Sequence, residues 1–550
     1  MSTRPLLLEI GTEELPSSFV DAALAALPDL IRARLADLRL SHGEVHALGS
    51  PRRLSVLVDA VAERQSDLDE EVIGPPEAHA YKDGKPTKAA EAFATKLGVP
   101  VESLAIADKP AEGKQKAGRY LVGRRAEKGS AARELLGKAL LDVCEKIPFR
   151  KSMRWGDLDA TFGRPVQWLV ALFGADPIDL SFAGVRSGRT TRGHRFLAPK
   201  PFDLPTADAY VPAMREHHVL VDRAERERVM MERVADAAKK LGGDYDGASI
   251  LVSENASLVE EPFVVVGGYD PVYLSLPPSV IRAVARGHQR YFCVEKSEDE
   301  LLPHYLAVVN TANAPDKIRK GMDRVMRARL ADARFFYEED KKAKIADRLE
   351  KTAGIVFHAR LGTVREKVSR IEYLAGAISD ALGFPDSERK LVVRAAHLCK
   401  FDLVSLMVGE FPELQGQMGR AYALHAGEHA TVADAVRDHY KPVGATDDLP
   451  ASDVSRIVAL ADRIDSLTGC FAIGLSPTGA ADPFGLRRAC IAVLRILCEV
   501  GASDARYAEL DLGDLVGRAY ANILPKKLDL DAGATVAKVL DFARERLRGI

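Results

Sequence analysis

Two groups of residues have types and spacings that could bind a metal ion. In the first, His425-Ala-Gly-Glu-His429 fits the H-x-x-E-H pattern, which places two imidazoles one helical turn apart. Gly427 disfavours the helix that this geometry requires, and the sequence offers no identifiable third ligand. We therefore interpret the motif as a solvated helix end and expect no metal there.

The second group resembles the frame of the His-Asp phosphohydrolase superfamily, which binds a divalent metal through an adjacent His-Asp pair and a distant Asp. No His-Asp dipeptide occurs in the sequence, and Cys399 and Lys400 stand at the matching position. A lysine ammonium has no lone pair to donate and opposes a cation by its charge. We expect a degenerate site at Cys399, Lys400 and Asp462, with a metal-dependent phosphohydrolase kept as an alternative.

Motifs for nucleotide chemistry are missing from the sequence. It contains neither a G-x-x-x-x-G-K-[ST] loop nor a G-x-G-x-x-G turn, and neither class of aminoacyl-tRNA synthetase signature is found. We therefore expect no catalytic residue and no bound cofactor in this chain.

Local positive charge is the remaining chemical signal. Residues 146–195 hold nine Lys or Arg against four Asp, a net charge of +5 in a chain whose total is −2. Arginine forks pair with phosphates and exposed aromatic rings stack on unpaired bases, so this composition favours RNA contact, with a solvated, salt-bridged face as the alternative. The candidate RNA-contact residues, including two shorter basic segments, are Arg52, Arg53, Arg150, Lys151, Arg154, Trp155, Arg186, Arg189, Arg192, His194, Arg195, Arg286, His288 and Arg290.

The elements that position these residues follow from hydrophobic periodicity. Strands are predicted at 6–10, 54–58, 119–123, 168–173, 263–266 and 305–309, and a helix at 19–35 with a kink or break at Pro28. From residue 323 onward apolar residues recur at helical spacing, including one run from Val392 to Leu406. This pattern predicts a multidomain α+β chain: an N-terminal mixed body over 1–345 with an insert at about 62–145, an all-α domain over 346–505, and the start of a helical linker over 506–550.

Composition limits the class of protein. A chain of 550 residues with 47% hydrophobic residues can form about three or four domains. Six scattered cysteines without a CxxC pair indicate buried thiols, and no apolar run is long enough to span a bilayer. We expect a cytoplasmic protein.

Several segments together resemble the β-subunit family of heterotetrameric bacterial glycyl-tRNA synthetases. The resemblance runs through the whole chain in order, and its most specific segments are EFPELQG and DPFGLRRA. The matching segments are LLLEIGTEELP, SPRRL, PFRKSMRWGD, RPVQWLVALFG, SGRTTRGHRF, RGHQRYF, RVMRARLADARFFYEED, FDLVSLMVGEFPELQGQMGRAYALHAGE, ADRIDSL and DPFGLRRA.

The resemblance implies a division of labour between two kinds of subunit. A separate α subunit would hold ATP, Mg²⁺ and glycine, while the β subunit would bind tRNA(Gly) within an α2β2 assembly and carry a degenerate His-Asp-like domain. The family normally continues into a C-terminal helical anticodon-binding domain, and this sequence stops at Ile550. We expect a truncation there. A non-catalytic scaffold remains a third alternative.

Overall fold

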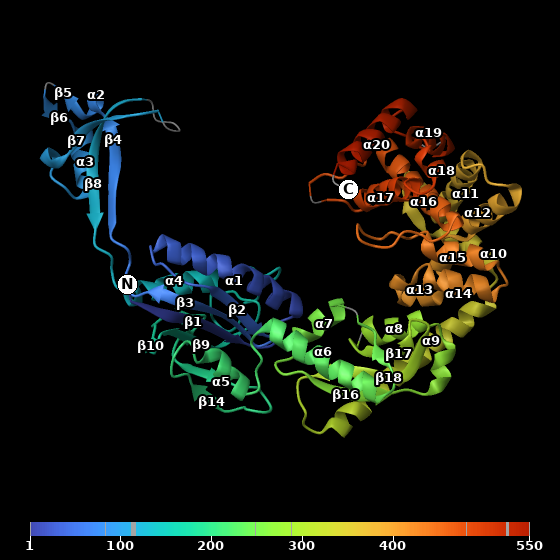
Figure 1. The fold of residues 1–550 in the computed structure, drawn as a ribbon, viewed down its shortest axis with the longest axis horizontal. Helices are drawn as coiled ribbons and strands as arrows, with labels where there is room; N and C mark the ends of the chain where they lie inside the picture. The colour runs from blue at the N-terminus through green and yellow to red at the C-terminus, as the bar shows by residue number, and fades with distance from the viewer. Residues whose placement is uncertain are drawn as a thin grey trace. The chain divides into compact units, whose positions relative to one another are not determined.

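The computed structural model describes residues 2–82, 84–111, 117–247, 249–287, 289–479, 481–523 and 527–548 (Figure 1). The chain is mixed α/β and divides into two compact units. Unit 1 is Met1–Leu241, Gly247–Val265 and Leu306–Asp316, and unit 2 is Gly242–Asp246, Val266–Tyr305 and Lys317–Ile550. Among the helices of the described ranges, none is long and apolar enough to cross a membrane.

A five-stranded sheet forms the centre of unit 1, in the order β10-β9-β1-β3-β2. The central strand β1 runs antiparallel to both neighbours, with Leu8 opposite Val56 on β3 and Ala171 on β9. The strands are β1 (Thr3–Thr12), β2 (Val45–Ser50), β3 (Arg53–Ala62), β9 (Val166–Phe173) and β10 (Asp176–Pro177). The predicted strands at 6–10, 54–58 and 168–173 lie within β1, β3 and β9.

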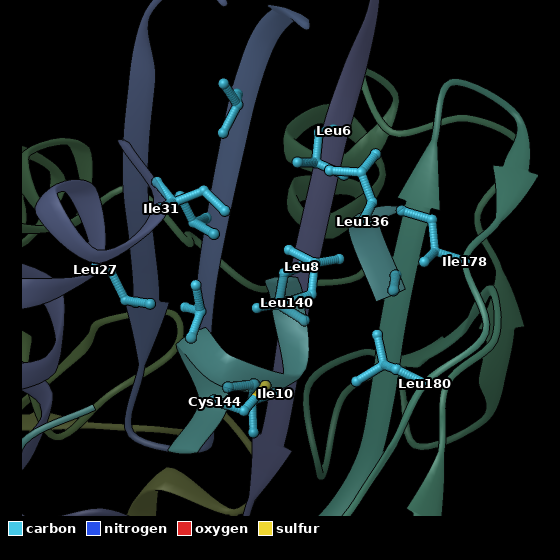
Figure 2. Close-up of a cluster of buried hydrophobic side chains, with 14 of the residues drawn as sticks. Leu6, Leu8, Ile10, Leu27, Ile31, Leu136, Leu140, Cys144, Ile178 and Leu180 are labelled. Carbon is cyan, nitrogen blue, oxygen red and sulfur yellow. The ribbon is translucent and has the colours of Figure 1, made fainter. Parts of the chain in front are cut away.

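Both faces of this sheet are buried, because alternate residues of β1 serve two separate cores. Leu6, Leu8 and Ile10 pack with side chains of α1 (Ser17–Asp37) and α4 (Ala132–Lys146), as Figure 2 shows. Leu7 lies on the other face, in the core that includes Tyr210 of α5 (Tyr210–Glu216). Helix α1 continues through Pro28, so of the predicted kink or break the break is wrong.

The predicted insert is a small sheet with its own core. Its strands are ordered β4-β8-β7, and Phe93 of α3 packs with Leu104 and Leu121. The elements of this part are β4 (Leu68–Pro76), α2 (Glu77–Ala80), β5 (Tyr81–Lys82), β6 (Lys85–Pro86), α3 (Lys88–Leu97), η1 (Val101–Ser103), β7 (Ala105–Lys109) and β8 (Gly118–Glu127).

The chain between β10 and residue 309 consists of short hairpins, helices and one further sheet. This sheet has four strands in the order β15-β17-β18-β16. The elements are β11 (Ser181–Phe182), β12 (Val185–Arg186), β13 (Thr190–Arg192), β14 (Pro201–Asp203), α6 (Arg223–Lys240), β15 (Asp244–Tyr245), α7 (Ser249–Ala256), β16 (Phe263–Gly268), η2 (Pro271–Ser275), α8 (Pro278–Gly287), β17 (Phe292–Ser297) and β18 (Glu300–Val309).

Helices dominate the described part of unit 2 after residue 314, with one short hairpin. Helix α16 is its centre, since fifteen of its twenty residues are buried and it packs against α11, α15, α17, α19 and α20. The elements are α9 (Pro315–Lys342), α10 (Ile345–Lys351), η3 (Thr352–Gly354), β19 (Val356–His358), β20 (Gly362–Thr363), α11 (Val364–Ala381), α12 (Asp386–Leu398), η4 (Phe401–Val404), α13 (Leu406–Glu410), η5 (Pro412–Leu414), α14 (Gln417–His425), α15 (Ala430–Asp438), α16 (Asp453–Ala472), α17 (Leu486–Arg495), the π-helical segment η6 (Ile496–Val500), α18 (Ala505–Ala508), α19 (Leu512–Ile523) and α20 (Ala532–Leu547).

One helical prediction needs correction. The run from Val392 to Leu406 is interrupted, because α12 ends at Leu398 and a 3-10 turn follows. In that turn the buried carboxylate of Asp402 accepts hydrogen bonds from the backbone N–H groups of Gly416 and Gly419. These long-range bonds fix a turn where the apolar spacing alone favoured continued helix.

Candidate functional site

The three residues predicted as a degenerate His-Asp site, Cys399, Lys400 and Asp462, lie close together in the helical part of unit 2. Lys400 follows α12, and its Nζ atom lies 2.7 Å from Oδ2 of Asp462 on α16. A second lysine, Lys367 of α11, places its Nζ atom 2.8 Å from Oδ1 of the same carboxylate. Both oxygens of Asp462 are therefore paired with an ammonium group.

His439, at the end of α15, completes this cluster. Lys400 Nζ donates to Nε2 of His439 at 2.8 Å, while Nδ1 of the ring donates to the carbonyl of Val436. Burial and then the Lys400 charge hold the pKa of His439 well below its usual value, so the imidazole is neutral. Lys400 also lies 3.9 Å from the ring centroid of Tyr440, a favourable cation–π contact.

The charges of Lys367 and Lys400 keep the Asp462 carboxylate ionised although it is largely removed from solvent. Burial alone would raise the pKa of Asp462, but the Lys367 and Lys400 ammoniums hold it well below the usual range. Cys399 is fully buried, and burial raises the pKa of its thiol to about 12. A divalent cation needs free carboxylate oxygens, so this donor set, with two competing cations and a neutral thiol, does not fit one.

The H-x-x-E-H motif does not form a two-histidine face. His425 is the last residue of α14, whereas His429 is the N-cap of α15 and accepts a hydrogen bond from the backbone of Thr431. Between them Gly427 has a φ of 83°, which ends the helix. The two imidazoles thus belong to two different helix ends.

Arg53 has no exposed side-chain surface. Its guanidinium contacts Glu9 at 3.2 Å and Glu260 at 2.9 Å, and it donates to the carbonyl of Arg192 at 2.7 Å. Glu9 also accepts from Trp168 Nε1 at 3.0 Å. This corrects the interpretation of Arg53 as an RNA contact, because its hydrogen-bonding groups are directed at buried carboxylates inside unit 1.

Arg52 and His194 are likewise buried, at 6% and 0% exposure. Arg52 lies over the Trp168 ring at 5.6 Å from the centroid, as does Arg192 at 5.2 Å. His194 Nε2 is 3.0 Å from Oδ1 of Asn310. Burial of Arg52 and His194 corrects their interpretation as surface contacts too, whereas Arg192 is half-buried.

Two of the four arginines in the second half of the predicted basic segment are neutralised within unit 1. Arg186 forms two hydrogen bonds with Asp179, at 2.8 and 3.1 Å. Arg195 pairs with Glu13 at 3.4 Å and also with Glu14. Arg189 donates to the carbonyl of Ala175 at 3.0 Å. The net charge counted along the sequence therefore overstates the positive potential that these arginines present to a ligand.

Three cations in the first half of the predicted basic segment are not paired with acids among the residues that the structure describes. Arg150, Lys151 and Arg154 are exposed, and within the described ranges no carboxylate lies within 4.0 Å of any of them. Trp155 beside them is half-buried and packs against the core under α1 and α4. Phe149 is held among Phe19 and Phe162, at centroid distances of 5.5 and 4.7 Å. The three cations Arg150, Lys151 and Arg154 thus have no carboxylate partner in the described part of the chain, and the aromatic side chains next to them in sequence are packed against the core.

The last candidate segment lies in unit 2. Arg286 pairs with Asp246 at 2.8 Å, and burial raises the pKa of that carboxyl to about 6 despite the arginine. Arg290 is exposed with a φ of 54°, and its backbone N–H donates to the carbonyl of Arg286. His288 lies outside the described residues.

Sequence reasoning missed Lys367 and Glu260, which complete the two buried networks. Lys367 had a detectable signal, because it stands on the otherwise apolar face of α11 that includes Val364, Val368 and Ile371. Glu260 had none, since it pairs with Arg53 across 207 residues of sequence.

Comparison with known proteins places the chain in a family. The family described as "Glycyl-tRNA synthetase beta subunit" matches residues 6–550. The chain is 45% identical to the glycine-tRNA ligase β subunit of Myxococcus xanthus over 549 residues, covering 100% of this chain and 77% of that protein. It is 44% identical to the corresponding subunit of an Anaeromyxobacter species and 41% identical to that of Geobacter sulfurreducens, covering 99% of this chain and 76% and 77% of those proteins. A match that is continuous from β1 to the last helix, at this level of identity, means that the chain belongs to the glycyl-tRNA synthetase β-subunit family.

Proposed function

We propose that this chain is an obligatory, non-activating subunit of a glycine-tRNA ligase and binds tRNA(Gly) for the ligation reaction. The observation that carries this proposal is the exposed trio Arg150, Lys151 and Arg154, which has no carboxylate partner among the described residues. Unpaired cations on a folded surface attract the phosphate backbone of RNA. Family membership supplies the identity of the RNA.

A separate α subunit forms part of this proposal. ATP, Mg²⁺ and glycine would bind to that subunit in an α2β2 assembly, and this chain would bind no cofactor of its own. The proposal places the assembly in the cytoplasm, where aminoacyl-tRNA is used for protein synthesis. It also treats residues 1–345 as the tRNA- and α-subunit-contacting region and 506–550 as a helical linker.

We assign a structural role to the helical domain over 346–505. Its His-Asp-like site is degenerate, since Lys400 and Lys367 pair with the oxygens of Asp462 that a metal would need. In this proposal the two ammoniums take over the cross-linking that a cation would provide between α11, α16 and the end of α12. The Asp462 carboxylate would thereby connect α11, α16 and the end of α12 and would take no part in a reaction.

Reconstitution tests this division of labour. Glycine-dependent exchange of pyrophosphate into ATP, and charging of glycine tRNA, are measured with this chain alone, with an α subunit alone and with the mixture. We expect charging only by the mixture and no exchange by this chain alone. Exchange by the purified chain would overturn the assignment of activation to the α subunit, and charging by α alone at the rate of the mixture would overturn the obligatory role.

A further inference from the structure

Helix α9 carries a basic stripe that the candidate residues chosen from the sequence do not include. Its buried residues are Met326, Leu330, Ala333 and Asp340. With 3.6 residues per turn, the opposite side of the helix and the flank next to it are occupied by a different set. This set, called here the α9 basic stripe, consists of Lys317, Lys320, Arg324, Arg327 and Arg334, all exposed.

The stripe is not neutralised by neighbours. Lys320, Arg324, Arg327 and Arg334 have no carboxylate within 4.0 Å in the part of the chain that the structure describes, and the nearby Glu338 pairs with Lys341. By contrast Arg329, which points away from the stripe, lies 4.0 Å from Glu410. Four cations of one sign therefore stand together on an exposed face.

The length and rigidity of the helix suit an extended polyanion. Lys320 and Arg334 are fourteen residues apart, which on a helix is about 21 Å. Along that distance a nucleic-acid strand presents several phosphates, since charges on one strand of a duplex recur every ~3.4 Å along its axis. The helix presents its cations at fixed intervals, so the stripe is suited to a row of phosphates along a nucleic-acid strand and not to a single small anion.

An exposed aromatic ring distinguishes RNA from other polyanions. Phe335 is 59% exposed and lies on the same side of the helix as Arg324, eleven residues or about three turns further along. Its neighbour Phe336 packs edge-to-face against it at a centroid distance of 6.0 Å. A ring held in this way can stack on an unpaired base, which proteins use to bind single-stranded parts of RNA.

We propose that the α9 basic stripe and Phe335 form an RNA-binding surface of this chain, separate from the trio Arg150, Lys151 and Arg154. The stripe would bind the phosphate backbone of tRNA, and Phe335 would stack on an unpaired base. This inference rests on the proposed function, because it names a second surface for the same RNA.

The test compares two triple variants of the full chain. Arg324→Ala, Arg327→Ala and Arg334→Ala together remove three charges from the stripe, and alanine is a good helix former, so α9 is preserved. The matched control replaces Arg389, Arg518 and Arg544 of the same unit with alanine. Arg518 and Arg544 are exposed and Arg389 is half-buried, and the three pair with Asp514, Asp541 and Asp380. Binding of glycine tRNA is measured by fluorescence anisotropy over a range of salt concentrations.

We expect the stripe variant to bind at least about tenfold more weakly, and the slope of log K against log salt to fall in magnitude by about 2. The control triple should keep the affinity and slope of the unmodified chain within a factor of about two. Phe335→Ala should weaken binding without changing the slope, since no phosphate contact is lost. Circular dichroism should show the same helix content in all variants.

The outcomes separate this inference from the proposed function. If the unmodified chain binds tRNA and the stripe variant binds equally well, the α9 surface is overturned and the proposed function stands. Loss of α-subunit binding with unchanged tRNA affinity would also overturn it. If the unmodified chain does not bind glycine tRNA, both fail.

Discussion

Lys400 and Asp462 form an ion pair, with the ammonium nitrogen 2.7 Å from Oδ2, at two of the positions where the sequence predicts a degenerate metal site. The lysine side chain is 8% exposed and the carboxylate 13%. Since Lys367 pairs with the other oxygen, the carboxylate and its two ammoniums act as a cross-link between helices.

Replacing Lys400 should destabilise the helical part of unit 2. Lys400→Met removes one of the two cations of Asp462 and leaves a hydrogen bond to His439 unmade, which we expect to cost about 3 kcal/mol. Hydrogen exchange of the α16 amides measures the loss locally. Lys390→Met, at an exposed position of α12, is the matched control and should change protection by less than about 0.5 kcal/mol. Equal protection in both variants would contradict the cross-link.

His439 should make stability depend on pH. Its pKa in the folded chain is well below the value of 6.5 expected when unfolded, so between these values only the unfolded chain binds the proton. Stability from this group is therefore full above pH ~6.5 and is lost as the pH falls, by about 1 kcal/mol between pH 7.5 and 5.5. His439→Gln keeps an acceptor for Lys400 and should reduce this pH dependence in urea unfolding. Identical profiles would contradict the assignment.

Local patterns in the sequence predicted the elements but not the partners of the charged residues. The run Leu6–Ile10 is apolar apart from Glu9 and predicts a strand, and Met326, Leu330 and Ala333 mark the buried face of α9. The sequence predicts Arg52 and Arg53 as RNA contacts, because the residues that pack against them are remote in the chain. Arg53 pairs with Glu9 across 44 residues and with Glu260 across 207, and only folding brings these groups together.

The same limit explains the basic segment. Nine cations against four acids predicted one continuous patch, yet Arg195 is neutralised by Glu13 and Glu14, which lie some 180 residues away in the sequence. Conversely, the residues predicted from the sequence omit α9, although residues 317–334 hold seven Lys or Arg against two Asp. Only the folded helix shows which of these cations are exposed. A count of charged residues along the sequence predicts binding only when the structure shows which of those side chains are exposed and unpaired.

The buried carboxylate pair in unit 1 predicts that Arg53 cannot be replaced by lysine. Lysine retains the charge but lacks the planar fork that reaches Glu9, Glu260 and the carbonyl of Arg192 together. Arg53→Lys should destabilise unit 1 by about 3 kcal/mol. Both tryptophans of the chain, Trp155 and Trp168, belong to unit 1, so tryptophan fluorescence during urea unfolding reports on this unit. Arg150→Lys is the control, and an equal effect of the two substitutions would disprove the network.

Thiol reactivity should distinguish one cysteine from the other five. Cys498 is exposed, whereas Cys144, Cys293, Cys399, Cys470 and Cys490 are buried. Burial raises the thiol pKa of Cys399 to about 12 and that of Cys470 and Cys490 to about 11, so these groups carry almost no thiolate at neutral pH. One equivalent of thiol reagent should react with the native chain, and Cys498→Ser should abolish this reaction. Two or more fast-reacting thiols in the folded chain would contradict the packing.

The exposed trio predicts a specific change in tRNA binding. Replacing Arg150, Lys151 and Arg154 with alanine should reduce the magnitude of the salt slope by about 0.7 to 0.9 for each lost phosphate contact and raise the Michaelis constant for tRNA in the reconstituted enzyme. Glycine-dependent pyrophosphate exchange should remain nearly unchanged, because activation belongs to the α subunit in the proposed function. Arg186→Ala is the control, since Asp179 already neutralises Arg186.

Trp155 requires a different substitution from the rest of this surface. Its ring packs partly on the core under α1 and α4, so Trp155→Ala would remove packing as well as any stacking on a base. Trp155→Phe keeps an aromatic ring and most of the packing, and we expect it to leave both fold and affinity close to those of the unmodified chain. If the trio variant instead loses pyrophosphate exchange and keeps its tRNA affinity, then residues 150–154 contact the α subunit, and their assignment to RNA is wrong.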